Sequence, residues 1–162
     1  MTSAPETPAE GSAVPAVAVT PSECRPAPLA ATLRVALARS WRRTRAERGD
    51  VDLPDVQFSI LVRLVKDGTT TPGEIAEFHR IRPPSATRAV KHLEELGLAT
   101  RETHPTDGRQ VLVAITEAGR EEVRETMRRR DAWLARQLAA LTPHDRETLA
   151  RASALLTQIA ES

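Results

Sequence analysis

The sequence of 162 residues contains one cysteine, no tyrosine and very few other aromatic residues. A single thiol, Cys24, can form neither an internal disulfide nor a zinc site built from several cysteines, and it fits a reducing compartment such as the cytoplasm. Because aromatic residues make up only 2% of the chain, a platform on which single-stranded nucleic acid stacks its bases is not expected.

Long apolar runs and a strong net charge are also missing. No segment approaches the roughly 20 apolar residues that cross a bilayer, and the first residues lack the basic start and apolar core of a secretion signal. We therefore expect a soluble cytoplasmic protein that does not act on a membrane. The formal net charge is only +1, so any basic surface for nucleic acid must be local.

Signatures of catalysis and of metal binding are absent as well. No nucleophile with its base, phosphate-binding loop or pair of carboxylates has a recognisable spacing. Two histidines four residues apart on a helix can share a metal ion, and no such pair occurs among His79, His92, His104 and His144. The sequence therefore predicts no enzyme, no metal site and no cofactor.

Proline is concentrated at the start of the chain. Residues 1–28 hold half of the 12 prolines, interleaved with Ala, Ser, Thr and Val. Repeated prolines interrupt helices, and this composition offers little to bury, so residues 1–28 are predicted to be a disordered tail. Cys24 lies in this tail and is expected to be an inert thiol.

Long amphipathic segments follow the tail and also close the sequence. A stripe with a spacing of four residues predicts a helix over 29–48, ended by Gly49: Leu29, Leu33, Leu37 and Trp41. Two more helices are predicted at 117–141 and 143–160. A second copy of the chain is the simplest cover for these stripes, and a monomer that folds them back on itself is the alternative.

Three shorter helices are predicted between these segments. The first covers 54–67, with inward-facing Phe58, Leu61, Leu64 and Val65. The second begins at Thr71, whose hydroxyl forms a capping box with Glu74, and it takes either Phe78 or His79 into its apolar side. The third runs from Pro83 to Leu96. Two apolar runs, 98–103 and 110–115, then flank a turn and predict a β-hairpin.

The helix at 83–96 is apolar on one face and polar and basic on the other. The second helix of a helix-turn-helix with this character lies in the major groove of DNA, and a hairpin directly after it acts as a wing. Arg88 and Lys91 suit the acceptors of guanine, while Ser85 and Thr87 can bond to bases or phosphates. A solvated helix face is the alternative for both cations. Acidic residues at 94 and 95 leave the first half of the helix as the part that faces phosphates.

Residues 53–119 contain a series of short pieces in a fixed order: Leu53, Pro54 and Gln57, then TPGEIA at 71–76, PPSATR at 83–88, LEELGL at 93–98 and DGRQVLVAITEAG at 107–119. Together these pieces resemble the winged helix-turn-helix of the MarR family of bacterial transcription regulators. The last piece follows the family pattern of Asp, any residue, Arg, five residues, an aliphatic residue, Thr, two residues and Gly. A looser similarity covers nearly everything after residue 28.

Three positions depart from the family pattern, all around the turn of the helix-turn-helix. His79 stands where the family usually has an aliphatic core residue, and Arg80 replaces a common glycine. Arg82 stands where a Ser or Thr would cap the recognition helix. The geometry of this turn is therefore less strongly specified than the helices on either side.

The resemblance implies a mainly α fold with a small β-hairpin wing. It implies a winged helix-turn-helix lobe at 53–116, an N-terminal dimerisation helix at 29–49 and C-terminal dimerisation helices at 117–162. It also implies that Arg109, at the wing tip, enters the minor groove, which attracts arginine where it is narrow. Asp107 would orient the wing through an ion pair, and an ordinary turn residue is the alternative for that position.

The function implied by the resemblance is sequence-specific regulation of transcription. The expected partners are double-stranded DNA with a palindromic operator, a second copy of the chain, and a small-molecule effector that releases the DNA. DNA contacts are expected from Ser85, Thr87, Arg88, Lys91 and Arg109. A winged helix used for protein contacts without DNA is the alternative function.

Overall fold

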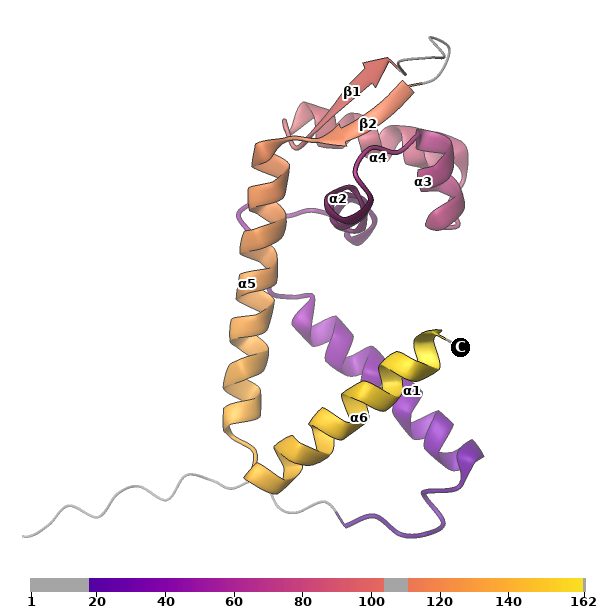
Figure 1. The fold of residues 1–162 in the computed structure, drawn as a ribbon, viewed down its shortest axis with the longest axis vertical. Helices are drawn as coiled ribbons and strands as arrows, with labels where there is room; N and C mark the ends of the chain where they lie inside the picture. Colours follow the sequence, from indigo (N-terminus) through magenta and orange to yellow (C-terminus); the bar gives the residue numbers. More distant parts are fainter. Residues whose placement is uncertain (1–17, 104–110, 162) are drawn as a thin grey trace, which may run out of the picture. The chain divides into compact units, whose positions relative to one another are not determined.

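The computed structural model describes residues 18–103 and 111–161. In these ranges it has six helices and one antiparallel hairpin (Figure 1). The elements are α1 (Pro26–Thr44), α2 (Asp55–Asp67), α3 (Pro72–Phe78), α4 (Pro83–Glu95), β1 (Ala99–Thr103), β2 (Val111–Ile115), α5 (Glu117–Ala139) and α6 (Pro143–Glu161). The predicted fold class, mainly α with a hairpin, is confirmed.

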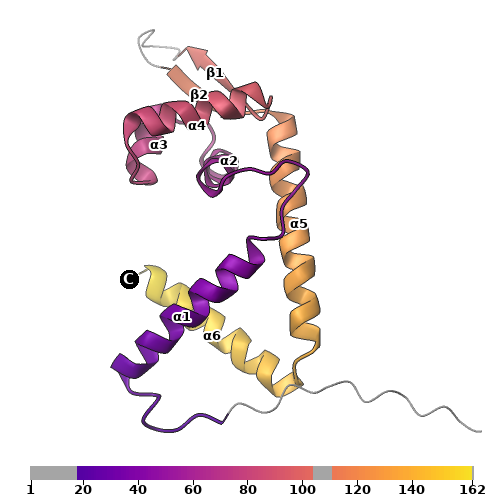
Figure 2. The ribbon, with the colours of Figure 1, turned by 180° about the vertical axis from the view of Figure 1, so that it is seen from behind.

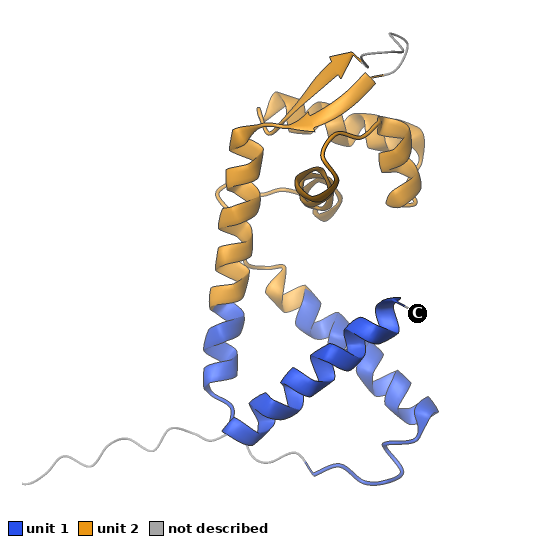
Figure 3. Ribbon diagram, viewed as in Figure 1, with its two compact units in different colours: residues 1–41, 133–162 blue, residues 42–132 orange. Residues whose placement is uncertain are grey.

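The chain divides into two compact units, which have separate colours in Figure 3. Residues 42–132 form one unit, which contains α2, α3, α4, the hairpin and the first part of α5. The other unit consists of residues 1–41 and 133–162, and its described part holds most of α1, the end of α5 and α6. The unit of residues 42–132 is longer at both ends than the lobe predicted at 53–116.

The hydrophobic core described here lies in the unit of residues 42–132. Its innermost side chains come from α2, α3, α4 and β2, and each is less than 2% exposed: Ile60, Leu61, Leu64, Ile75, Val90, Leu93 and Val113. Val65 was predicted to face inward and is 43% exposed. Ile60 and Leu64, four residues apart, form the buried stripe with Leu61, and Val65 lies beyond its edge.

Strand β2 forms backbone hydrogen bonds on both of its edges, with β1 on one edge and with Thr70 on the other. Its register places Ala99 opposite Ile115 and Arg101 opposite Val113. On the other edge of β2, the amide of Val113 donates to the carbonyl of Thr70 at 2.7 Å, and the amide of Thr70 donates back at 3.1 Å. The connection between α2 and α3 therefore holds the base of the hairpin, and the hairpin lies beside α4 (Figure 2).

The unit that contains α1 and α6 has a different character. Neither α1 nor α6 contains a buried residue. Large apolar side chains remain exposed along both helices: Leu29, Val35, Leu37, Trp41, Leu149, Leu155 and Ile159. These helices therefore carry apolar surface that the described chain does not cover.

Both ends of α1 differ from the prediction. The helix begins at Pro26, so residues 26–28 are helical rather than part of the predicted disordered tail, because proline is compatible with a first helical turn. Residues 1–17 lie outside the described residues. The helix ends at Thr44 rather than at residue 48. The carbonyls of residues 47–49 accept hydrogen bonds from Arg129 and Arg130 of α5.

Candidate nucleic-acid interface

A capping box starts α3 as predicted. The amide of Glu74 donates to Thr71 Oγ1 at 3.2 Å, and the Glu74 carboxylate accepts from the amide of Thr71 at 2.8 Å. Thr70 Oγ1 donates to the same carboxylate at 2.9 Å. These hydrogen bonds, the one from the Thr71 backbone first, lower the pKa of Glu74. The first helix-turn-helix member is thus fixed at its N-terminus despite its length of seven residues.

The end of α3 resolves the choice between Phe78 and His79. His79 is half-buried, whereas Phe78 is 62% exposed and carries the guanidinium of Arg63 4.4 Å from its ring centroid. Burial, and secondarily the charge of Arg63, lowers the pKa of His79. Among the described residues, none provides a hydrogen-bond partner for the buried His79 Nε2.

The turn into α4 has the irregularities that the sequence indicates. Arg80 has a φ of 50°, in the left-handed region where glycine is favoured. Arg82 occupies the N-cap position of α4 and makes no capping hydrogen bond with its side chain. Pro83 at the first helical position still fixes where the helix begins.

The two-faced character predicted for α4 is present in the structure. Its buried side is made by Ala86, Ala89, Val90 and Leu93. Thr87, Arg88 and Lys91 are exposed, and Ser85 is half-buried. The polar side chains predicted to contact DNA are therefore on the surface of one helix, opposite its buried face.

Three polar contacts hold α4 against its neighbours, one on the side of α2 and two on the side of the hairpin. On the side of α2, His92 Nδ1 lies 2.8 Å from Gln57 Oε1. On the side of the hairpin, Arg101 Nε lies 3.1 Å from Glu94 Oε2, and Arg101 Nη2 donates to the carbonyl of Thr87 at 3.4 Å. The rotation of α4 about its own axis is consequently restrained from both flanks.

The predicted DNA-contacting side chains make mainly local contacts. Arg88 Nη2 donates to Ser85 Oγ at 3.5 Å, and Thr87 Oγ1 donates to the carbonyl of Pro83 at 3.1 Å. Lys91 Nζ lies 3.5 Å from Glu95 Oε1. Two further predicted site residues, Asp107 and Arg109, lie outside the described residues.

A shallow pocket of about 280 Å³ separates the start of α2 from α4. Pro54, Gln57, Ser85 and Arg88 are among the residues that line it. Gln57, His92 and Arg101 are not among the residues predicted from the sequence to contact DNA. One signal was available for His92, which follows Arg88 by four residues and so lies near it on the helix surface.

The Thr and Gly of the wing motif have a structural explanation. Thr116 precedes α5, and its hydroxyl accepts from the amide of Gly119 at 3.0 Å while it donates to the carbonyl of Gly97 at 2.7 Å. The amide of Thr116 donates to the carbonyl of Leu98 at 3.1 Å. Thr116 therefore joins three elements: the end of α4, the start of β1 and the start of α5.

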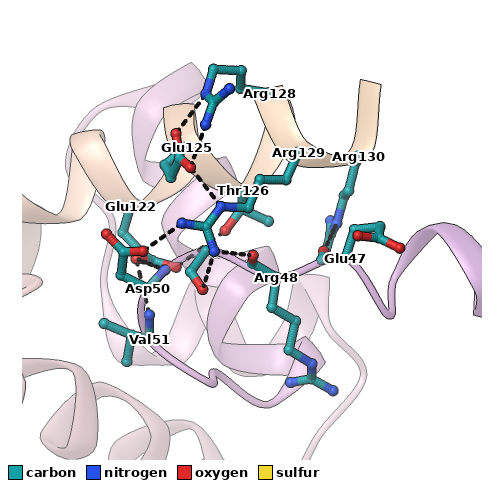
Figure 4. A network of polar contacts seen from close by, with 11 residues as sticks. Glu47, Arg48, Asp50, Val51, Glu122, Glu125, Thr126, Arg128, Arg129 and Arg130 are labelled. Carbon is teal, nitrogen blue, oxygen red and sulfur yellow. Dashed lines mark hydrogen bonds and ion pairs between the residues drawn. The ribbon is translucent and has the colours of Figure 1, made fainter. Parts of the chain in front are cut away.

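A polar network ties the connection between α1 and α2 to α5 (Figure 4). The carboxylate of Glu122, only 6% exposed, accepts from the amides of Asp50 and Val51 at 3.2 and 3.3 Å. Arg129 Nη1 donates to the carbonyls of Arg48 and Gly49 at 3.1 and 3.2 Å. A carboxylate thus holds the amides of this connection, and a guanidinium holds its carbonyls.

The same network includes a strongly paired carboxylate. Glu125 accepts from Arg128 and Arg129, and these hydrogen bonds lower the pKa of Glu125 to about 2. Arg130 lies at the other end, where its Nε donates to the carbonyl of Glu47 and its guanidinium stacks 4.3 Å from the ring centroid of Phe58. The start of α2 is therefore fixed from α5.

Within the described ranges, no group of three His, Cys, Asp or Glu side chains is arranged to hold a metal ion. None of the helices described is both long and apolar enough to cross a membrane. Cys24 is exposed, in the segment before α1.

Comparison with known proteins connects this geometry to a family. Residues 51–110 match the model of the MarR family. An uncharacterised HTH-type transcriptional regulator from Mycobacterium bovis is 38% identical over 133 residues, covering 82% of this chain and 93% of the relative. The HTH-type transcriptional repressor MdtR from Bacillus subtilis is 34% identical, covering 65% of this chain and 68% of the repressor. A candidate transcriptional regulator from Pseudomonas aeruginosa has a crystal structure with a TM-score of 0.73 and 31% identity, covering 83% and 95% of the two chains.

Proposed function

Because this chain belongs to the MarR family of transcription regulators, we propose that it binds palindromic operators in double-stranded DNA as a homodimer. The observation that carries the proposal is the exposed polar and basic surface of α4, with Arg88 and Lys91 opposite the buried Ala86 and Val90. A major groove admits one such helix, and its free face then meets the base edges.

The restraint on α4 supports this mechanism physically. A helix that reads bases must keep its orientation, because a small rotation moves each hydrogen-bonding group away from its acceptor. The contacts from Gln57 and Arg101 restrain α4 before any DNA is bound. We propose that Arg88 and Lys91 contact base edges, and that Ser85 and Thr87 contact bases or phosphates.

The wing completes the proposed interface. Arg109 is proposed to enter the minor groove beside the site, where A·T-rich sequences concentrate negative potential. Asp107 is proposed to orient the wing. The anchoring of β2 to Thr70 supports this arrangement, since it fixes the base from which the wing tip extends.

The dimer is supported by the surface of the unit that contains α1 and α6. Neither helix has a buried residue, yet Leu37, Trp41, Leu155 and Ile159 are each between 47% and 66% exposed. Apolar surface gathered on helices outside the core is typical of an interface between subunits. A twofold dimer would also match the symmetry of a palindromic operator.

A small-molecule effector that releases the DNA is part of the proposal and is supported by the family relationship. Release would follow if the effector bound the DNA-free form more tightly than the DNA-bound form. A panel of small phenolic compounds, added to the labelled complex, tests this point. We place the protein in the cytoplasm, where it meets DNA, and assign it no enzymatic activity.

The test is a fluorescence anisotropy titration with duplexes selected from a random pool. The Arg88→Ala variant should lose about 1–3 kcal/mol of discrimination at one base pair in each half-site. The Arg109→Ala variant should weaken binding to most duplexes and flatten the salt dependence by about one unit. Arg25→Ala, which removes an exposed arginine from the segment before α1, is the matched control and should bind as the wild type does.

The outcome also separates DNA binding from the alternative function. If both arginine variants bind the selected duplex at wild-type strength across a salt series, the DNA-reading mechanism is wrong. If the wild type binds no duplex, the winged helix serves protein contacts instead. An insertion of about five base pairs between half-sites rotates one of them to the far side of the helix, and unchanged affinity would contradict the dimer.

A further inference from the structure

The second half of α4 repels DNA phosphates less strongly than its two acidic residues indicate. Two carboxylates lie there, Glu94 and Glu95, and both have cationic partners in the structure. Arg101 Nε lies 3.1 Å from Glu94, and Lys91 Nζ lies 3.5 Å from Glu95. Because opposite charges at this range offset one another's field, the last turns of α4 do not present an unopposed acidic surface to phosphates.

His92 lies in the same part of α4 and takes part in neither of these ion pairs. It is exposed, and it follows Arg88 by four residues, so the two lie one turn apart on neighbouring parts of the helix surface. Arg88 and Lys91 lie nearer the middle of the exposed face, opposite Ala86, Ala89, Val90 and Leu93, whereas His92 lies toward its edge. An edge position faces the sugar-phosphate strand beside the groove rather than the base pairs.

The ring of His92 is already held in place. Its Nδ1 lies 2.8 Å from Oε1 of Gln57, a half-buried residue in the first turn of α2 that lies 35 positions earlier. In this contact Nδ1 donates, because the amide oxygen of Gln57 can only accept, and Nε2 is left to a ligand. A phosphate also only accepts, so the contact proposed below is made by the doubly protonated, cationic ring, in which both nitrogens donate. A side chain fixed before binding loses less conformational entropy when it makes a contact.

We propose that His92 contacts a phosphate of the operator backbone through Nε2, and that Gln57 is the positioning residue that orients its ring. The inference rests on the proposed DNA-binding function. It adds a contact on the flank of α4 next to α2, one helical turn beyond Arg88. It also gives the last turns of α4 a part in binding.

The direct test compares His92→Ala with the wild type on two labelled probes of about 30 base pairs, long enough for two half-sites. One probe is a mixture of random sequences, and the other is the tightest duplex selected from that mixture. A phosphate contact should be lost on both, with binding about three- to tenfold weaker, the range for one net hydrogen bond. Arg25→Ala, which removes an exposed polar side chain from the segment before α1, should bind both probes as the wild type does.

To test whether Gln57 orients the ring of His92, the measurement must report on that ring and not only on the stability of the fold. In the wild type, addition of the selected duplex should shift the ¹⁵N resonance of His92 Nε2. In Gln57→Ala the shift should be smaller and the affinity should fall by no more than in His92→Ala. The double variant should bind no more weakly than His92→Ala alone, because both substitutions remove the same contact.

Each result has a defined meaning. If the wild type binds DNA and His92→Ala binds both probes equally well, the phosphate contact does not exist. A loss confined to the selected duplex would assign His92 to a base edge and overturn the proposal in that way. If the losses of Gln57→Ala and His92→Ala add in the double variant, Gln57 is not the positioning residue. Failure of the wild type to bind either probe would instead overturn the proposed function.

Discussion

Gly119 in the first turn of α5 lies directly against the backbone of Leu98: a β-carbon placed on Gly119 would be 2.1 Å from the Leu98 carbonyl oxygen. That oxygen cannot turn aside cheaply, because it accepts from the amide of Thr116 at 3.1 Å. Gly119→Ala should therefore lower the free energy of unfolding by about 2–3 kcal/mol. Urea denaturation followed by circular dichroism measures the change.

Gly73→Ala is the matched control for the substitution at Gly119. Both glycines lie in the first turn of a helix, but a β-carbon on Gly73 would meet nothing nearer than Thr71 Oγ1 at 3.7 Å. Alanine should be tolerated there and should stabilise α3 by up to about 0.5–1 kcal/mol, the usual advantage over glycine in a helix. Equal losses at both positions would show that the contact with Leu98 does not decide the outcome.

Glu122→Gln tests the polar network between α5 and the residues after α1. The carboxylate accepts two backbone amides and the Thr126 hydroxyl, and an amide group can supply only one acceptor oxygen. We expect a loss of about 1–3 kcal/mol, the cost of leaving a buried donor unsatisfied. Glu121→Gln, at an exposed neighbour, should change stability by less than about 0.5 kcal/mol. A loss at Glu122 no larger than at Glu121 would contradict this role.

Arg80→Gly should stabilise the turn between α3 and α4. Arg80 has a φ of 50°, and the left-handed conformation costs a residue with a β-carbon about 1–2 kcal/mol. The larger backbone entropy of glycine in the unfolded chain offsets about 0.5–1 kcal/mol of this gain. Valine, which is branched at the β-carbon, should destabilise the same position. Thermal unfolding of the wild type and the two variants gives the order of their stabilities. A valine variant more stable than the wild type would show that the backbone at position 80 is not strained.

His79→Leu should alter how stability depends on pH. Burial and Arg63 hold the pKa of His79 below its ordinary value of 6.5, so the unfolded chain binds more protons between those two values. The free energy of unfolding should therefore fall as the pH drops through 6.5 and level off below the folded pKa. The leucine variant should be more stable and should lack this part of the decline. Urea midpoints across the range measure it, and parallel profiles would contradict the prediction.

Local signals account for the elements that the sequence predicted well. The capping box of Thr71 and Glu74 and the proline at position 83 act within a single turn, so the starts of α3 and α4 can be read from neighbouring residues. The buried face of α4 follows from helical periodicity alone. For the same reason, the exposed positions of Thr87, Arg88 and Lys91 agree with the sequence pattern.

Other features depend on partners far away in the chain. The residues after the end of α1 at Thr44 are held by side chains more than 70 positions later: the carboxylate of Glu122 accepts from their amides, and Arg129 donates to their carbonyls. The contact between Gln57 and His92 spans 35 positions and has no local signature. Periodicity could identify the exposed face of α4, but only the tertiary structure shows what restrains it.

The paired amides of Thr70 and Val113 have a consequence for hydrogen exchange. Thr70 is 4% exposed and Val113 is fully buried, and each amide donates to the carbonyl of the other. Neither proton can reach solvent unless β2 separates from the connection between α2 and α3, which requires the core around Val113 to open. Deuterium should therefore enter these two positions only through global unfolding, while the amides of α6, which has no buried residue, exchange through local opening. The base of the wing should therefore belong to the most slowly exchanging part of the molecule.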